Sequence, residues 1–109
     1  MATLYQLHST MDTLRRNTEE MSRTWRTGDS IVLLGTTVAF IDWFNAYVAD
    51  SDIQDIAGIY ALADDVTQLT PNTSAKLNLE AKLSGVLTDI EWVHLTQNHQ
   101  FDKVVTITL

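Results

Sequence analysis

The order of apolar and polar positions divides the chain into short apolar runs and amphipathic segments. Residues 2–8 alternate apolar and polar side chains, and residues 30–34 and 58–62 are almost continuously apolar. Both patterns are typical of β-strands. The run 30–34 lies between Gly28 and Gly35, and a continuously apolar strand indicates burial on both faces. Residues 84–88 and the β-branched run 103–109 predict two further strands.

Between these runs, apolar residues recur at helical spacing. Residues 11–25 carry apolar side chains three and four positions apart, which predicts an amphipathic helix that follows a cap at Ser9 or Thr10 and ends before Gly28. The same kind of pattern predicts helices at 37–48 and 89–99, and a short helical turn through residue 69. Residues 73–83 are rich in the helix formers Leu, Glu, Ala and Lys and predict another helix, while the alternation at Leu77 and Leu79 leaves a strand as the alternative. The predicted caps of the later segments are Thr36 or Thr37, Asp64 or Asp65, and Asp89.

Strands that alternate with helices define an α/β fold. With 109 residues, of which 45% are hydrophobic, the chain is expected to form a single domain over residues 1–109 with one substantial core. We therefore expect a small, mostly parallel sheet with helices on both faces.

Charge restricts the partners that this fold can take. The formal net charge is −7, and residues 27–75 contain seven aspartates and no lysine or arginine. A surface of this kind repels phosphate backbones and favours a basic protein partner, so direct nucleic-acid binding is not expected. Four of the seven basic residues lie together between positions 15 and 26.

The chain contains no cysteine, which excludes disulfides, thiolate metal sites and cysteine nucleophiles on this chain. No apolar run approaches the roughly 20 residues that a membrane-spanning helix needs, and no signal peptide is recognised. We therefore expect a cytoplasmic protein without a membrane partner.

The turn after residues 30–34 is the place where α/β proteins usually bind ligands. Gly35, Thr36 and Thr37 could hold a phosphate at a helix N-terminus, which leaves a small-ligand or nucleotide-binding domain as an alternative. The turn is neither a Walker A loop nor a G-x-G-x-x-G loop. His94 and His99 are five positions apart, a poor spacing for one metal ion. No cofactor, metal or catalytic residue is therefore predicted.

Three residues are instead candidates for a subunit interface. His8 ends the first predicted strand at the edge where function usually lies. Trp43 and Phe44 are adjacent, so they cannot both face the same core. One of the two is expected to contact a partner chain, since aromatic residues anchor many interfaces, or to lie at a helix edge.

Four motifs in order give the chain a family resemblance. They are L-x-x-L-H at residues 4–8, G-D-S-I-V-L-L-G-T-T-V at 28–38, Y-A-L-A-D-D-V at 60–66 and W-V-H-L-T at 92–96, and a short apolar strand follows them. The ordered set resembles the DsrH/TusB family, the small subunits of the DsrEFH and TusBCD sulfur-relay complexes. The chain departs from the family pattern between residues 65 and 92, where residues 72–83 form an additional segment.

The resemblance implies a DsrEFH-like three-layer fold that assembles with TusC-like and TusD-like (DsrF- and DsrE-like) subunits into a heterohexamer. Such complexes pass persulfide sulfur toward the 2-thiouridine of tRNA wobble positions, and the relay cysteine lies on the TusD or DsrE subunit. Because this chain has no cysteine, it looks like the TusB-type, non-catalytic partner. Two alternatives remain. The chain could be a subunit of a DsrEFH-like sulfur-oxidation complex, or a free-standing homo-oligomeric regulator that has lost the relay.

Overall fold

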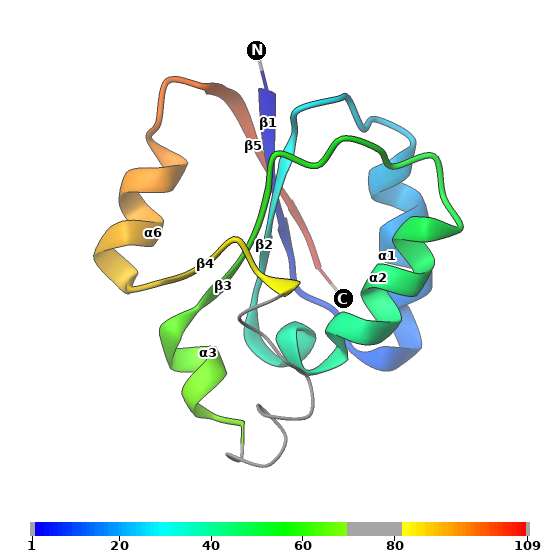
Figure 1. The fold of residues 1–109 in the computed structure, drawn as a ribbon, viewed down its shortest axis with the longest axis horizontal. Helices are drawn as coiled ribbons and strands as arrows, with labels where there is room; N and C mark the ends of the chain where they lie inside the picture. The colour runs from blue at the N-terminus through cyan, green and yellow to red at the C-terminus, as the bar shows by residue number, and fades with distance from the viewer. Residues whose placement is uncertain (1, 70–81, 109) are drawn as a thin grey trace.

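The computed structural model describes residues 2–69 and 82–108, which fold into strands and helices that alternate along the chain (Figure 1). The five strands are β1 (Ala2–Leu7), β2 (Ser30–Leu33), β3 (Gly58–Leu62), β4 (Gly85–Leu87) and β5 (Phe101–Ile107). The helices are α1 (Met11–Ser22), the 3₁₀ helix η1 (Gly35–Phe40), α2 (Ile41–Ala49), α3 (Ala63–Thr67) and α6 (Asp89–Thr96).

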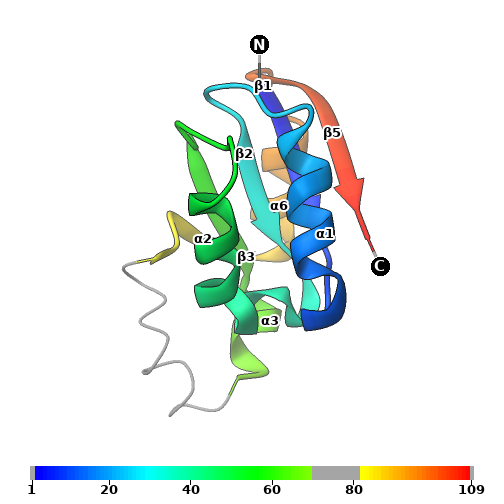
Figure 2. The same cartoon turned by 90° about the vertical axis from the view of Figure 1, so that its right-hand side faces the viewer.

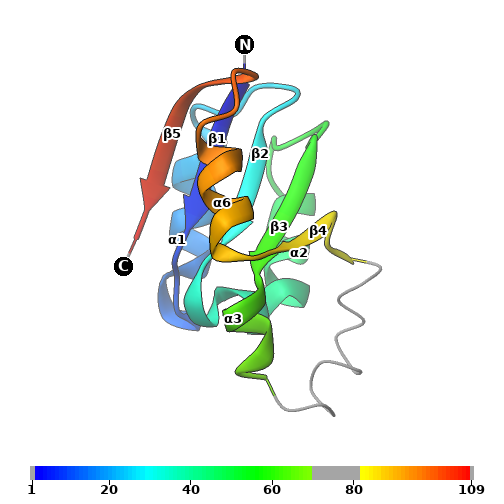
Figure 3. The ribbon, with the colours of Figure 1, turned by 90° about the vertical axis from the view of Figure 1, so that its left-hand side faces the viewer.

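The strands form one sheet in the order β4-β3-β2-β1-β5, and every pair of neighbours is parallel. Helices α1 and α2 cover one face of this sheet (Figure 2), and α6 covers the other (Figure 3). The predicted α/β class, with a small parallel sheet and helices on both faces, is confirmed.

Side chains that alternate along the strands build two cores. On the face below α1 and α2, Tyr5, Leu7 and Leu33 are buried together with Phe44 of α2. On the opposite face, a smaller cluster packs against Trp92 of α6; its buried members are Leu4, Val32, Leu62 and Phe101. Both faces of the central strand β2 are buried, as its continuous apolar run predicted.

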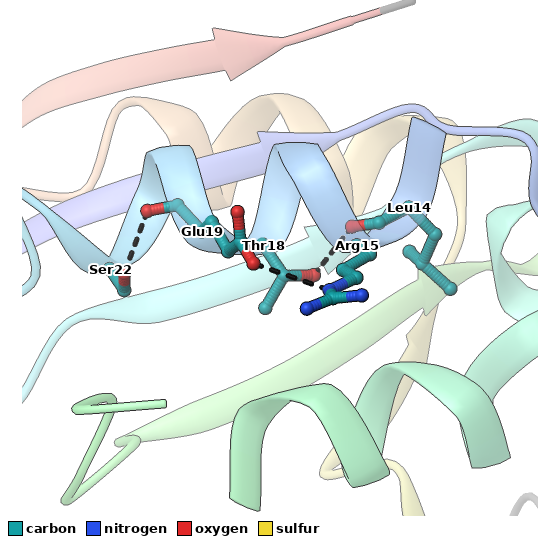
Figure 4. A network of polar contacts seen from close by, with 5 residues as sticks. All are labelled: Leu14, Arg15, Thr18, Glu19 and Ser22. Atoms are coloured by element: carbon teal, nitrogen blue, oxygen red, sulfur yellow. Dashed lines mark hydrogen bonds and ion pairs between the residues drawn. The ribbon is translucent and has the colours of Figure 1, made fainter. Parts of the chain in front are cut away.

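Helix α1 ends earlier than its apolar spacing predicted (Figure 4). The helix ends at Ser22, and the hydroxyl groups of Thr18 and Ser22 donate to main-chain carbonyls within it, at 2.8 and 2.6 Å. Trp25 lies beyond the helix because its ring stacks on Tyr5, with the ring centroids 5.5 Å apart, and its indole N–H donates to the Gln54 carbonyl. These tertiary contacts override the helical period at residue 25.

Several predicted boundaries and caps are corrected by the structure. The segment predicted as one helix at 37–48 consists of η1 followed by α2, and α6 ends at Thr96 rather than near residue 99. The cap of α6 is Thr88, so Asp89 is the first helical residue. Strand β5 begins at Phe101, two residues earlier than predicted. The predicted helix at 73–83 lies, apart from Lys82 and Leu83, outside the described residues.

Helix α6 depends on a reciprocal cap. The Thr88 hydroxyl accepts from the Glu91 N–H at 3.2 Å, and the Glu91 carboxylate accepts from the Thr88 N–H at 3.0 Å. Hydrogen bonds to the Glu91 carboxylate from the Thr88 N–H and from the Thr88 side chain lower the pKa of Glu91. Since the folded-state pKa is lowered, this stabilisation is present above the pKa that Glu91 has in the unfolded chain. It is lost as the pH falls through the lowered value.

We expect Thr88→Ala to destabilise the protein by about 1 kcal/mol, because the cap hydroxyl is removed from α6. The pKa of Glu91 should rise in the same variant, since one of its stabilising contacts is lost. Urea unfolding measures the first effect, and NMR titration of the Glu91 carboxyl measures the second. Thr88→Ser, which keeps the hydroxyl, is the matched control and should change neither quantity appreciably.

Candidate functional site

The loops that follow the carboxyl ends of the strands form the edge of the sheet where α/β proteins usually place their sites. His8 follows β1, Gly35 follows β2, and Asp65 lies in the first turn of α3 after β3. In Figure 1, η1 and α3 both lie at this end of the sheet. The fold thus brings together turns that are about 30 residues apart in sequence.

The amide of the Gly35 turn is already occupied by a side chain of the protein. Its N–H donates to the Asp65 carboxylate at 2.8 Å. A bound phosphate at this turn would need the same donor, and a carboxylate beside it would repel an anion. Neither Asp64 nor Asp65 acts as the predicted cap, because Leu62 occupies that position without a side-chain cap. Asp65 instead joins α3 to the end of β2.

A buried hydroxyl and amide network lies behind this turn. Thr37 is fully buried within η1, where its hydroxyl accepts from the Ser9 N–H at 2.8 Å and donates to the Ser9 carbonyl at 3.2 Å. Asn17 of α1 donates its side-chain amide to the Ser9 hydroxyl at 2.6 Å. The sequence predicted that Thr37 could cap the helix. Its hydroxyl instead links η1 to the turn after β1 through the two hydrogen bonds to Ser9. The network gives this edge the character of a rigid scaffold.

His8 is exposed and lies against the same turn. Gly35 has a φ of +60°, and a Cβ added there would lie 2.7 Å from the His8 Nε2 atom. We expect Gly35→Ala to destabilise the protein by about 1–2 kcal/mol, because alanine is strained at this φ. The added methyl group should also displace the imidazole ring.

Thermal or urea unfolding measures the cost of Gly35→Ala, and the NMR signals of the His8 ring report its displacement. Gly28→Ala is the control, since Gly28 has a φ of +92° but open space around its would-be Cβ. That variant should be destabilised while the His8 signals stay in place. Unchanged His8 signals in Gly35→Ala would contradict the close approach of the ring.

The other two interface candidates separate clearly. Phe44 is fully buried in the core below α2, whereas the Trp43 side chain is 56% exposed. Trp43 is therefore the residue of the pair that faces outward. Phe44 is a core residue, so it is no longer a candidate for the interface. Asp42, beside Trp43, forms an ion pair with Lys82.

Sequence reasoning did not identify a second exposed apolar surface on α6. Ile90 and Val93 are 69% and 49% exposed, and residues three apart lie on the same side of a helix. We call this pair the outer face of α6. The signal was present in the sequence, because apolar residues at 90, 92, 93 and 95 surround more of the helix than a single sheet contact can bury. Trp92 faces inward and donates its indole N–H to the Gln6 side chain at 2.7 Å.

Within residues 2–69 and 82–108, no group of three His, Asp or Glu side chains is arranged to hold a metal ion. In the same part of the chain, the longest apolar helical stretches fall short of what a membrane span requires. Comparisons with protein-family models, with curated proteins and with solved structures found no match.

Proposed function

We propose that this chain is a non-catalytic structural subunit of a TusBCD-like sulfur-relay complex that serves the 2-thiolation of tRNA wobble uridine. In this role the chain completes an interface with TusC-like and TusD-like subunits, and the relay cysteine belongs to a partner. The complex is cytoplasmic, and this chain does not contact the nucleic acid.

The observation that carries the subunit role is the exposure of large apolar side chains on two opposite layers. Trp43 projects from α2 on one side of the sheet, and the outer face of α6 lies on the other. Tryptophan is a typical anchor of protein interfaces, and adjoining exposed apolar side chains mark a second candidate contact surface. Two separate surfaces suit a chain that contacts two different neighbours.

The sulfur-relay role rests on the ordered motifs and on the missing thiol. Three of the motifs fall on the adjacent strands β1, β2 and β3 with the turns that follow them, and the fourth falls on α6. A persulfide carrier needs a reactive cysteine in an electropositive setting, and this sequence has no cysteine. The combination favours a partner that shelters the persulfide of another subunit.

The alternatives differ in how well the geometry suits them. A nucleotide or small anion at the Gly35 turn is disfavoured by the Asp65 carboxylate, which already takes the Gly35 N–H. A subunit of a DsrEFH-like sulfur-oxidation complex would present the same surfaces. The reaction that the partner subunits carry out distinguishes a sulfur-oxidation complex from the tRNA relay.

The proposal is tested by co-expressing the tagged chain with the TusC-like and TusD-like chains of the same genome and isolating it by its tag. We expect a stable complex that contains both partners in fixed proportion. Trp43→Ala should weaken the complex while leaving the isolated chain folded. A chain that elutes alone in the presence of both partners would overturn the proposal.

A further inference from the structure

Strand β5 ends the sheet with an open edge. It pairs only with β1 among the described residues, and it is seven residues long. The His8 N–H donates to the Ile107 carbonyl at 2.9 Å, so Ile107 bonds toward β1. Because main-chain groups alternate in direction along a strand, those of Val104 and Thr106 point to the outer edge. A long edge of this kind is a template for another strand.

A groove lies beside this edge on the α1 side of the sheet. It consists of two adjoining cavities of about 580 and 570 Å³ that share Tyr5, Thr24 and Val105 in their walls. Side chains of β5 that point to this side, such as Lys103 and Val105, form one wall, and the second half of α1 with residues 23–26 after it forms the other. The groove therefore runs along the open strand.

The groove concentrates positive charge in a chain of net charge −7. Four of the seven basic residues line it, and we call them the basic stripe: Arg16, Arg23, Arg26 and Lys103. Glu20 and Asp102 are the carboxylates in its walls, and Glu20 pairs with Arg23 at 3.7 Å. No carboxylate of the described residues forms an ion pair with the other three members of the stripe.

We propose that β5 and the basic stripe bind an extended acidic segment of a partner protein, which adds to the sheet as a sixth strand. The main chain of the segment bonds to the open edge of β5. Its alternate side chains lie over the groove, where carboxylates meet the basic stripe. This inference does not rest on the proposed function and holds whether or not the chain joins a sulfur relay.

A second copy of this chain fits the edge less well than an acidic segment. Strand β5 carries one aspartate and one lysine, so it offers no excess of negative charge. An antiparallel two-fold pair of β5 strands would also bring the two basic stripes together on the same side of the joined sheet. Like charges in that arrangement repel, and lysine on an edge strand generally opposes self-pairing.

The test uses the full chain and a short fluorescein-labelled peptide in which glutamate and valine alternate. We expect fluorescence anisotropy to show binding that weakens as salt is raised. Lys103→Glu should weaken binding about tenfold, since it reverses a charge of the basic stripe. Arg15→Glu is the matched control, because it makes the same change in net charge at a residue that lines a separate groove between α1 and α2. Figure 4 shows Arg15 beside Glu19, with which it forms an ion pair. The Arg15→Glu variant should change binding much less.

A second peptide separates strand addition from charge attraction without any change to the protein. The same peptide N-methylated at alternate residues keeps its carboxylates but cannot donate hydrogen bonds along one edge, and we expect its binding to be lost. The proposal would be overturned if the methylated peptide, or a lysine–valine peptide, bound as tightly as the glutamate–valine peptide. It would also be overturned if Arg15→Glu weakened binding as much as Lys103→Glu. A homodimer in sedimentation that the glutamate–valine peptide dissociates would assign the edge to a second copy instead.

Discussion

Phe44→Ala is expected to lower the free energy of unfolding by about 3–5 kcal/mol, because it removes a fully buried ring from the main core. A domain of this size is stabilised by about 5–15 kcal/mol in total, so the variant should lose a large share of its stability. At about 4 °C or more per kcal/mol, its midpoint of thermal unfolding should fall by more than about 12 °C. Chemical denaturation gives the free energy directly.

The neighbouring residue provides the matched control for this prediction. Trp43→Ala removes a larger ring from a mostly exposed position, so its cost should stay within about 1 kcal/mol. The same variant should weaken assembly with partner subunits, which the unfolding measurement does not detect. Comparable losses of stability in the two variants would contradict the assignment of Phe44 to the core and Trp43 to the surface.

Ile90→Gln combined with Val93→Gln is expected to weaken association with the partner subunits about 100-fold. The two substitutions remove the apolar outer face of α6 without altering net charge, and glutamine is a good helix former. Loss of two buried interface anchors corresponds to about 2.7 kcal/mol of binding free energy. Surface plasmon resonance with an immobilised partner measures the affinity, and circular dichroism confirms that the chain remains folded.

Residues Thr67 and Gln68 offer a control for these substitutions, because both are exposed polar positions away from α6. Their exchange for alanine should leave the affinity unchanged. If the double glutamine variant bound its partners as tightly as the wild type, the outer face of α6 would not be an interface. The subunit proposal would then rest on Trp43 alone.

The strands of the sheet could be predicted from local sequence patterns, because the burial of a strand determines which of its positions are apolar. The apolar run at β2, bounded by two glycines, indicates a strand covered on both faces, and that is its place in the sheet. Strand β3 coincides with the predicted residues 58–62. The end of α1 could not be predicted in the same way, because Trp25 leaves the helix for contacts with Tyr5 and Gln54.

The candidate site was less accessible to sequence reasoning, since long-range contacts decide it. Because Trp43 and Phe44 are adjacent, the sequence indicated that only one of them faces the core. The packing of α2 was needed to show that Phe44 is the buried one. The carboxylate of Asp65 reaches the Gly35 amide across 30 positions, and no local pattern predicts that pairing. The basic cluster at 15–26 was visible in the sequence, whereas the alignment of three of its members, Arg16, Arg23 and Arg26, with Lys103 along an open edge required the strand order.

The most direct test of the subunit proposal is native mass spectrometry of the complex isolated with the TusC-like and TusD-like chains after loading by a persulfide donor. The account predicts one assembly that contains all three chains, in which a partner cysteine gains the mass of sulfur and this chain keeps its own mass. A spectrum in which this chain is a monomer or homo-oligomer, apart from the sulfur-loaded partners, would contradict it.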